Sequence, residues 1–386
     1  MQKTIDFRIV VITDTFFEVN GIGSYYRTLL DWCRRTRGGN YTIVCPRRDD
    51  LAQGDVADDV IPIDPAIPVP NWLYKDLPLG IYSTSAVCKV LKSIPGPKVI
   101  HVATSGMLGA AGARAARRLR LPLVGFFHTD LRILRIYGRR LFSTFGEWAG
   151  SRVAYWADRL AYNRCQAVLA PSPTARDSVR KFYSGPVSML PYPLNVDRFR
   201  PASTRTGGFR DRYGRDGTVL VAAIGRVAQE KNLDLICKYL DSDPRISLVI
   251  VGDGPYSDAL RKRWNVRITG FLSGQDLVDA YQQADIFVQL SLIETFGFCV
   301  AEALACGLPS VVLRSTGLSA TLPPESGVEL LHESEIPELA DRCVGFARDP
   351  KRHQEAAVRA REFALRYSPD VLIPQFIDFH RSFLGG

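Results

Sequence analysis

The sequence predicts an α/β protein in which two doubly wound domains each contain a central parallel sheet. Short β-branched apolar runs alternate with helix-like stretches along the 386 residues. The alternation falls into two series, and a segment with the composition of a linker separates them. Continuous apolar runs are typical of strands buried on both faces, which occur where helices and right-handed crossovers cover a parallel sheet. A chain of this length also exceeds what one small core can organise, so two domains are expected.

The first series begins with Arg8–Ile12, which is expected to be a buried strand. Further strands are expected at 42–45, 99–102, 123–127 and 168–170, and helices at 21–34, 109–120 and 173–182. The second series begins with a strand at 219–224. Its later strands are expected at 247–251, 266–268, 286–289 and 310–313, and its helices from about 232, at 275–284 and at 298–306.

The boundary between the two series lies in residues 191–217, which read PYPLNVDRFRPASTRTGGFRDRYGRDG. This stretch is rich in Pro, Gly, Arg and Asp and poor in apolar periodicity, as linkers are. We therefore expect one domain over 1–195, a second over 196–365 and a terminal segment over 366–386. Ligands of doubly wound sheets bind beyond the carboxyl ends of the strands. Two facing domains of this kind would place those ends around one inter-domain cleft.

Composition and charge limit the classes of function. The chain has 46% hydrophobic and 23% charged residues, as ordinary soluble globular proteins do. The apolar run near the amino terminus is too short for a signal peptide, and no stretch approaches the length of a membrane span, so a cytoplasmic protein is expected. The eight cysteines form no CxxC pair, which favours a reducing compartment. The net charge of +9 favours anionic partners, but nucleic acid is not expected because no recognised binding motif is present.

The segment GRVAQEKN, Gly225–Asn232, lies between an expected strand and an expected helix. Gly225 allows a sharp turn and close backbone approach. Arg226 and Lys231 place two cations at this turn, and the start of a helix would add backbone donors and a positive dipole end. The combination predicts a diphosphate site, and the alternative is a loop with two solvated charges.

A second constellation is ETFGFCVAE, in which Glu294 and Glu302 flank a Phe-Gly pair. Glu294 follows the strand IFVQL, and Glu302 falls inside the next helix. A carboxylate can accept two hydroxyl groups at once, which suits the vicinal diols of ribose and of hexoses. Backbone N–H groups near Phe296 and Gly297 can reach a phosphate or sugar oxygen. The alternative is that both glutamates are ordinary helix charges, which explains Glu302 poorly because its neighbours are apolar.

Together these motifs resemble the retaining GT-B glycosyltransferases of family GT4. The resemblance extends through GRVAQEKN, VIVGDGP, ADIFVQLSLIETFGFCVAEALACGLPSVV, APSPTARDSV and NVDRFRP, and so covers most of the chain. It implies the GT-B fold, with two facing Rossmann-like domains, an acceptor-binding one first and a nucleotide-sugar-binding one second. A carboxyl-terminal helix that crosses back to the first domain is also implied.

The resemblance further implies residue roles. Glu294 would contact the donor sugar as a catalytic residue, and Glu302 would hold the nucleotide ribose. Arg226 and Lys231 would bind the diphosphate. The remaining donor-binding positions on this side would be Gly252, in the VIVGDGP motif, with Phe296 and Gly297.

Two features of the first half complete the expected site. Gly21 and Gly23 belong to a turn, Asn20-Gly21-Ile22-Gly23, whose backbone could approach the donor phosphates. His128 closes the run LPLVGFF, at a place where GT4 enzymes commonly carry a histidine near the donor sugar, so a catalytic role is expected for it. A structural histidine and a base for direct inversion are the competing interpretations.

The expected reaction is transfer of a hexose from a UDP- or GDP-hexose to an acceptor hydroxyl with retention of configuration. No second carboxylate is evident as a nucleophile, which favours front-face transfer with the leaving diphosphate helping to deprotonate the acceptor. No metal site and no cofactor are expected, because no DxD motif ends a strand and the two cations can neutralise the leaving group.

The acceptor is expected to be a glycan or a lipid. Arginines and apolar residues recur at helical spacing over 132–148, which predicts a basic amphipathic helix that could lie on an anionic membrane surface. The segments VATSGMLGAAGARAARRLRLPLVGFFHTD and VITDTFFEVNG look most like lipid-directed mannosyl-, sulfoquinovosyl- and galactosyltransferases. The alternative is that the helix over 132–148 packs on the first domain with a solvated basic face. If the lipid interpretation holds, the protein is expected to associate peripherally with the membrane.

Other functions stay open at this stage. The same scaffold could be a catalytically inactive nucleotide-sugar-binding module, or a transferase acting on a soluble small molecule or a polysaccharide. A dinucleotide oxidoreductase is weaker, because VGDGPYSDAL lacks the GxGxxG pattern.

Overall fold

The computed structural model describes residues 7–17, 21–36, 40–48, 58–68, 80–128, 152–153, 155–202, 207–315 and 317–384. The chain divides into two compact units, the first comprising Met1–Pro193 with Pro369–Gly386 and the second Leu194–Ser368. The first division lies inside the segment 191–217 that has linker composition. The terminal segment that returns to unit 1 begins at Pro369, three residues later than the expected 366. The expected basic helix over 132–148 lies outside the described residues.

Unit 1 contains a parallel sheet with the order β3-β2-β1-β6-β7-β8-β9. Its strands are β1 (Arg8–Ile12), β2 (Asn40–Pro46), β3 (Val60–Ile63), β6 (Lys98–Val102), β7 (Leu123–Phe126), β8 (Ala167–Ala170) and β9 (Val187–Met189). A short antiparallel pair, β4 (Ile67–Pro68) with β5 (Gly80–Ile81), lies apart from this sheet. Its labelled helices are α1 (Gly21–Thr36), α2 (Thr84–Ser93), α3 (Met107–Arg118), α5 (Pro173–Val179) and α13 (Pro369–Arg381).

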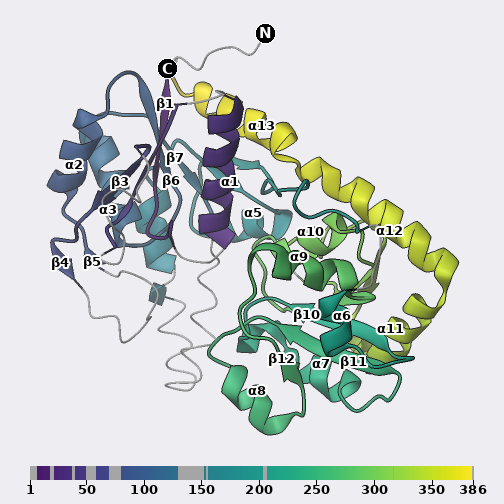
Figure 1. Cartoon of the computed structure of the whole chain (residues 1–386). Helices are drawn as coiled ribbons and strands as arrows, with labels where there is room; N and C mark the ends of the chain where they lie inside the picture. The colour runs from purple at the N-terminus through teal and green to yellow at the C-terminus, as the bar shows by residue number, and fades with distance from the viewer. Residues whose placement is uncertain are drawn as a thin grey trace. The chain divides into compact units, whose positions relative to one another are not determined.

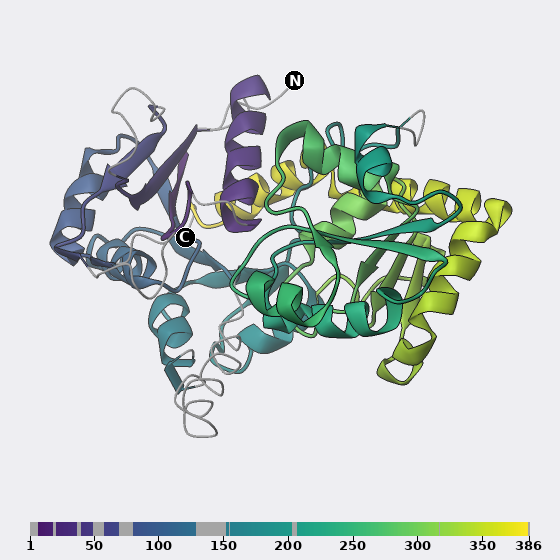
Figure 2. The ribbon, with the colours of Figure 1, turned by 60° about the horizontal axis from the view of Figure 1, so that its bottom comes forward.

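Helices cover both faces of this sheet because alternate residues of each strand point to opposite faces. Val10 and Ile12 of β1 belong to a core that includes α2 and α3. On the other face, α13 packs beside α1 (Figures 1 and 2), and the indole nitrogen of Trp32 donates to Asp370 Oδ1 at 2.5 Å. The last described helix of the chain is therefore an integral layer of unit 1.

Unit 2 contains a second parallel sheet, with the order β12-β11-β10-β13-β14-β15. Its strands are β10 (Val219–Ile224), β11 (Ile246–Val251), β12 (Arg267–Ile268), β13 (Ile286–Gln289), β14 (Ser310–Leu313) and β15 (Val328–Leu331). Its α-helices are α6 (Gly208–Tyr213), α7 (Leu233–Leu240), α8 (Ser257–Arg263), α9 (Gly274–Gln283), α10 (Phe298–Ala305), α11 (Leu339–Arg348) and α12 (Pro350–Ala364). Short 3-10 turns occur at η2 (Gln229–Lys231), η3 (Pro324–Ser326), η4 (Glu333–Glu338) and η5 (Leu365–Tyr367).

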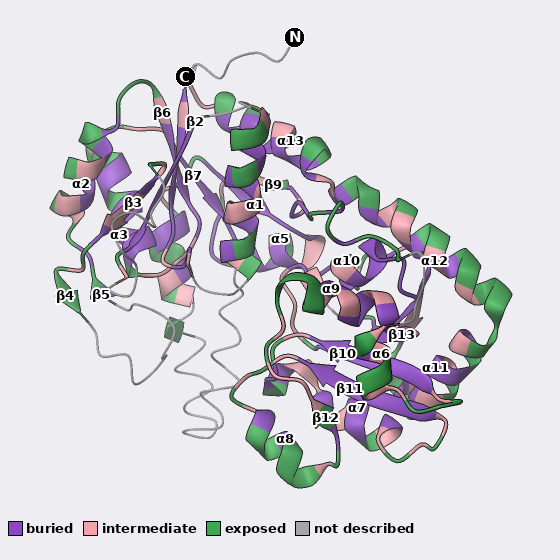
Figure 3. Ribbon diagram, in the orientation of Figure 1, coloured by how far each residue is buried: buried purple, intermediate pink, exposed green. Residues whose placement is uncertain are grey.

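The two sheets confirm the predicted α/β class. The strands are buried along most of their length, whereas the outward faces of the helices are exposed (Figure 3). The core of unit 2 joins β10, β11 and β13 to apolar side chains of α7, α8 and α11. Among the described residues, no helix is both long and apolar enough to cross a bilayer.

Candidate active site

The two loops that carry most of the predicted donor site lie side by side in unit 2. They follow β10 and β13, which are hydrogen-bonded neighbours in register Val221↔Ile286. Because parallel strands end at the same edge of a sheet, the loop after β10, which carries Arg226 and Lys231, lies beside the loop after β13, which carries Glu294. Asn232 ties the loops together, since its side-chain amide donates to the Leu290 carbonyl at 3.1 Å.

An ion pair between Lys231 and Glu294 lies at the centre of this edge. The Lys231 ammonium donates to Glu294 Oε1, and the two side chains are only 18% and 14% exposed. Gln289 Nε2 lies 3.4 Å from the same oxygen. Burial acts to lower the pKa of Lys231, but the Glu294 carboxylate outweighs it and the pKa is raised. Lys231 therefore stays protonated, and its positive charge is balanced by the negative charge of the Glu294 carboxylate.

Arg226 forms the second charged pair. Its guanidinium donates to Glu230 Oε1, one turn along the same loop. The Glu230 side chain is only 2% exposed, and its other oxygen has no hydrogen-bond partner within the described structure. The backbone N–H of Leu292 also donates to the Glu230 carbonyl at 3.2 Å. Glu230 thus holds the guanidinium of Arg226 and joins the two loops.

Glu302 lies on α10 beside Tyr281 of α9. The buried Tyr281 hydroxyl donates to Glu302 Oε2 at 2.7 Å. Burial raises the pKa of Glu302 to about 7, against the opposing effects of the Tyr281 hydrogen bond and of the Arg198 charge. Cys299, one turn earlier on α10, has its pKa raised to about 12 by the same burial, so its thiol is neutral. Glu302 is consequently poised between two protonation states near neutral pH.

Glycines let the backbone fold tightly at this edge. Gly225 and Gly252 follow β10 and β11 with φ of +144° and +140°. A Cβ on Gly252 would lie 2.0 Å from the Gly225 carbonyl oxygen, which no side chain can accommodate. Gly297, with φ of +100°, is the residue before α10. The Phe296 side chain is buried and contacts the Tyr367 ring, so only its backbone can take part in binding.

The structure places the other predicted residues in unit 1. Gly21 and Gly23 form the first turn of α1, not a separate turn before it. His128, just after β7, is 5% exposed, and both of its ring nitrogens are bonded to tyrosine hydroxyls. Burial lowers its pKa to about 3. The arrangement leaves neither nitrogen free to act as a base, and a catalytic role for His128 stays a prediction.

Sequence reasoning missed three residues of the unit 2 site. Glu230 was adjacent to Lys231 in the GRVAQEKN motif, and its spacing of four from Arg226 was a usable signal. Tyr281 and Gln289 reach the two glutamates from other elements, and no local pattern announces such contacts.

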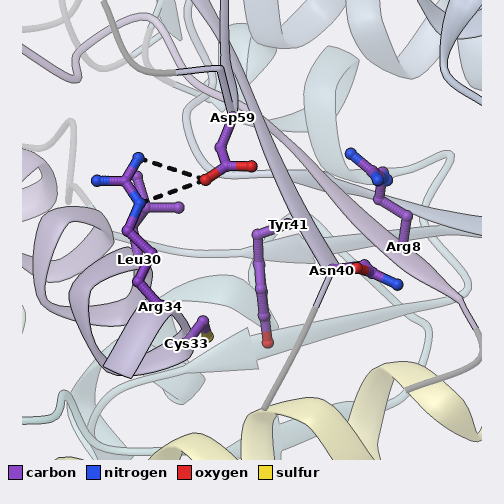
Figure 4. A pocket seen from close by; sticks show the side chains of 7 residues that line it. All are labelled: Arg8, Leu30, Cys33, Arg34, Asn40, Tyr41 and Asp59. Atoms are coloured by element: carbon purple, nitrogen blue, oxygen red, sulfur yellow. Dashed lines mark hydrogen bonds and ion pairs between the residues drawn. The ribbon is translucent and has the colours of Figure 1, made fainter. Parts of the chain in front are cut away.

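Elsewhere, two observations bear on other ligand classes. Among the described residues, no group of three or more His, Cys, Asp and Glu side chains is arranged to hold a metal ion. In unit 1, a small polar pocket lies at the amino-terminal ends of β1 and β2 (Figure 4). There Arg34 pairs with Asp59 beside Tyr41, and none of the predicted site residues lines it.

Comparison with known proteins places these residues in a family. Residues 19–198 match Glycosyltransferase Family 4, and residues 209–363 match Glycosyl transferases group 1. A GDP-mannose-dependent alpha-mannosyltransferase of Mycolicibacterium smegmatis is 30% identical over 316 residues, covering 80% of each chain. One from Corynebacterium glutamicum is 28% identical over 362 residues, covering 92% of this chain and 84% of that protein.

Solved structures agree with the fold. Anabaena HepE, crystallised in complex with UDP, superposes with a TM-score of 0.73 at 18% identity, covering 98% of this chain and 100% of that one. Sucrose-phosphate synthase from Thermosynechococcus elongatus gives a TM-score of 0.77 at 18% identity, covering 97% and 98%. Both family matches span residues of the candidate site. The chain therefore belongs to glycosyltransferase family 4, and the protein is a glycosyltransferase with the GT-B fold.

Proposed function

We propose that the protein transfers a hexose from a nucleotide-diphosphate sugar to an acceptor hydroxyl with retention of anomeric configuration. The observation that carries the proposal is the buried Lys231–Glu294 ion pair at the carboxyl edge of the unit 2 sheet. Arg226 belongs to the same loop as Lys231, and Glu302 to the helix that follows Glu294. The two cations at this edge suit a diphosphate. The carboxylates of Glu294, in the loop after β13, and of Glu302, in α10, suit sugar hydroxyls.

Retention by front-face transfer is favoured over a double displacement. Glu294 is bonded to the Lys231 ammonium, and Glu302 to the Tyr281 hydroxyl. A carboxylate that is paired with an ammonium, or that accepts a hydrogen bond from a hydroxyl, is a weaker nucleophile, so we assign neither residue a covalent role. Arg226 and Lys231 would stabilise the negative charge that develops on the leaving diphosphate. An oxygen of that diphosphate would take the proton of the acceptor hydroxyl. With both cations supplied by the protein, we propose that no divalent metal is required and that EDTA leaves the rate unchanged.

GDP-mannose is the donor to test first. Mannosyltransferases named as GDP-mannose-dependent, from three actinobacteria, align over 80–92% of this chain. UDP-hexoses are the alternative, because HepE has been crystallised with UDP and with UDP-glucose.

A lipid acceptor at a membrane surface is the second part of the proposal. Relatives include a sulfoquinovosyl transferase of Arabidopsis and an alpha-monoglucosyldiacylglycerol synthase of Acholeplasma. In unit 1, Val153, Trp156 and Leu160 are 61%, 50% and 47% exposed on one face of a helical stretch. Arg159 lies on the same face, with its guanidinium 5.8 Å from the centre of the Trp156 ring. Exposed aromatic and aliphatic side chains flanked by arginine suit the interface of an anionic bilayer.

The transferase proposal is tested by incubating the protein with UDP-, GDP- and ADP-hexoses and candidate acceptors, and by determining the anomeric configuration of the product by NMR. Glu294→Gln should lose turnover, whereas Glu325→Gln, an exposed glutamate of η3, should not. A product of inverted configuration would overturn retention. Binding of a nucleotide sugar without turnover by the wild type on any acceptor would indicate the inactive binding module instead.

The membrane proposal is tested by co-sedimentation with vesicles containing anionic phospholipid at low salt. The Trp156→Ser, Leu160→Ser double variant should lose most of its binding. Met189→Ser, which alters a residue 50% exposed on β9, should bind as the wild type does. Equal binding by all three proteins would remove the role of this helical face.

A further inference from the structure

A continuous chain of hydrogen bonds runs through the buried interior of unit 1. It joins His380 of α13, His101 of β6, Tyr26 of α1, His128 and Tyr192. The successive distances are 2.8 Å from His380 Nε2 to His101 Nδ1, 2.7 Å from His101 Nε2 to the Tyr26 hydroxyl, 2.7 Å from that hydroxyl to His128 Nε2, and 2.8 Å from His128 Nδ1 to the Tyr192 hydroxyl. None of the five side chains is more than 5% exposed.

The rings in this chain are neutral. Burial lowers the pKa of His380 to about 4 and that of His128 to about 3, and it places the pKa of His101 well below its usual value. Aromatic rings of Tyr25, Phe126 and Phe376 pack around the same groups, so a charge there would be poorly solvated. Each imidazole therefore carries one proton, on one of its two nitrogens.

The position of every proton then follows from one end of the chain. His380 Nδ1 lies 2.6 Å from the Phe376 carbonyl oxygen, which can only accept, so the proton of His380 is on Nδ1. Its Nε2 must accept from His101 Nδ1–H, which leaves His101 Nε2 to accept from the Tyr26 hydroxyl. The Tyr26 oxygen must then accept from His128 Nε2–H. His128 Nδ1 is left to accept from the Tyr192 hydroxyl.

The hydroxyl at the opposite end is chemically able to take either role. Tyr192 carries a hydroxyl, which can donate to His128 Nδ1 or accept from it. If donor and acceptor exchanged roles in each of these hydrogen bonds, every bond from His101 to Tyr192 would still form. Only the contact between His101 and His380 would fail, because two unprotonated nitrogens would then face each other at 2.8 Å. The Phe376 carbonyl and His380, both in α13, therefore fix the direction of these hydrogen bonds.

We propose that His380, His101 and Tyr26 are positioning residues that hold His128 as the Nε2–H tautomer, so that the hydrogen-bonding state of His128 depends on the seating of α13 in unit 1. These residues come from segments far apart in the sequence, and α13 is the last helix described. The proton arrangement stands on the contacts of unit 1, whereas its effect on catalysis rests on the proposed transferase function and on the catalytic role predicted for His128.

The test is ¹⁵N NMR of the imidazole nitrogens, which distinguishes the two neutral tautomers, in protein labelled at its five histidines. In the wild type, His128 should show a protonated Nε2 and an unprotonated Nδ1 that accepts a hydrogen bond. His380→Gln should keep this pattern, because its side-chain oxygen can replace Nε2 as the acceptor for His101. His380→Leu has no acceptor and should give a mixture of His128 tautomers.

Tyr26→Phe provides a second break, at the middle of the chain and with almost no change of shape. It removes the acceptor of His128 Nε2–H and should shift His128 to the Nδ1–H tautomer, donating to Tyr192. A wild type in which His128 is charged or protonated at Nδ1 would overturn the proposal. So would a His128 spectrum that both His380→Leu and Tyr26→Phe leave unchanged.

The activity readout separates this inference from the proposed function. For His380→Leu, kcat should fall by up to about a hundredfold, which is what a small misplacement of a site residue can cost. The donor KM should change little, and His380→Gln should restore kcat. Changed tautomers with unchanged kcat would keep the proton chain and remove His128 from the transfer step. A wild type that is inactive with every donor would refute the proposed function. The ¹⁵N spectra would still show whether His128 is held as the Nε2–H tautomer.

Discussion

At the scale of single residues, the carboxyl group of Glu302 is the titrating group that should govern donor affinity near neutral pH. Its pKa of about 7 reflects burial on α10, which outweighs the hydrogen bond from Tyr281. Only the carboxylate can accept two hydroxyl groups, because the neutral acid must use one oxygen as a donor. Protonation of Glu302 should therefore weaken its hold on a ribose diol.

We predict that the donor affinity of the wild type falls as the pH drops below 7, by up to about tenfold per pH unit. Glu302→Gln should bind the donor more weakly at about pH 8, and its affinity should vary little with pH. Isothermal titration calorimetry with GDP-mannose and with UDP-glucose checks both expectations. A wild-type affinity that does not change between about pH 6 and pH 8 would contradict the assignment of Glu302.

The same shift acts on stability with a defined sign. The folded-state pKa of Glu302 is raised above the ordinary value of 4.5. In the protein without donor, protonation of this group therefore stabilises the folded state relative to the unfolded state. That contribution is fully present below 4.5 and is lost as the pH rises through 7. Glu302→Gln should hence raise the urea midpoint above neutral pH and leave it nearly unchanged at about pH 4.5, where both proteins are neutral at this position.

At this scale, the sequence allowed the charged residues to be predicted but not their partners. Lys231 and Glu294 each lie directly after a strand of strong apolar character, so their meeting at one sheet edge could be expected. Tyr281, which comes from a different helix, could not be paired with Glu302 by any local spacing. The buried setting of His128 was likewise inaccessible, because its partners come from α1 and from the segment after β9.

At the scale of elements, the crossing of the turns after β10 and β11 determines the shape of the candidate site. The backbone of Gly252 approaches Gly225 so closely that a Cβ would overlap the carbonyl oxygen. Gly254 makes a similar approach, in which a Cβ would lie 2.3 Å from the Val227 carbonyl oxygen. These contacts hold the loop of Arg226 and Lys231 against the next turn.

Gly252→Ala should therefore destabilise unit 2 by about 1–3 kcal/mol or more, because it combines a positive φ with a backbone clash. Gly345→Ala is the matched control. It lies inside α11 with nothing within 4 Å of its Cβ, and replacing a helical glycine should stabilise by about 0.5–1 kcal/mol. Urea unfolding measures both. A neutral Gly252→Ala would show that the two turns do not depend on this approach.

The predicted bounds were most accurate for strands that are buried along most of their length. The expected strands 8–12, 219–224 and 286–289 have the bounds of β1, β10 and β13. The strands β9 and β15, of three and four residues, were not predicted, because their half-buried sequences lack a distinctive run. The turn η2 was also missed. It ends with Lys231, and Asn232, which follows it, has a φ of +53°.

At the scale of the whole molecule, the buried histidines of unit 1 and Glu302 of unit 2 should change the stability in opposite directions as the pH falls. His101, His128 and His380 are buried in unit 1 as neutral rings, with pKa values lowered by burial. A histidine with a lowered folded-state pKa binds fewer protons folded than unfolded, so stability falls as the pH drops through the window from 6.5 toward 4. Glu302 in unit 2 has the opposite sign and only partly offsets this loss.

We predict that acidification from about pH 7 to pH 5 lowers the free energy of unfolding, by up to ~1.4 kcal/mol per pH unit for each buried histidine. Replacing His380 with Gln should reduce this pH dependence by one proton. The measurement is the urea midpoint as a function of pH. A midpoint independent of pH in this range would mean that the three rings are not neutral and buried together.

The central claim is that the nucleotide sugar binds at the carboxyl edge of the unit 2 sheet, and amide hydrogen exchange with and without saturating donor tests it most directly. Exchange should slow in Gly225–Asn232, around Gly252 and in Glu294–Glu302, because bound donor would hold these loops closed. The segments lining the pocket of Figure 4 should not change. Measured donor binding that leaves the three unit 2 segments unprotected, or that protects only residues around Tyr41, would contradict the claim.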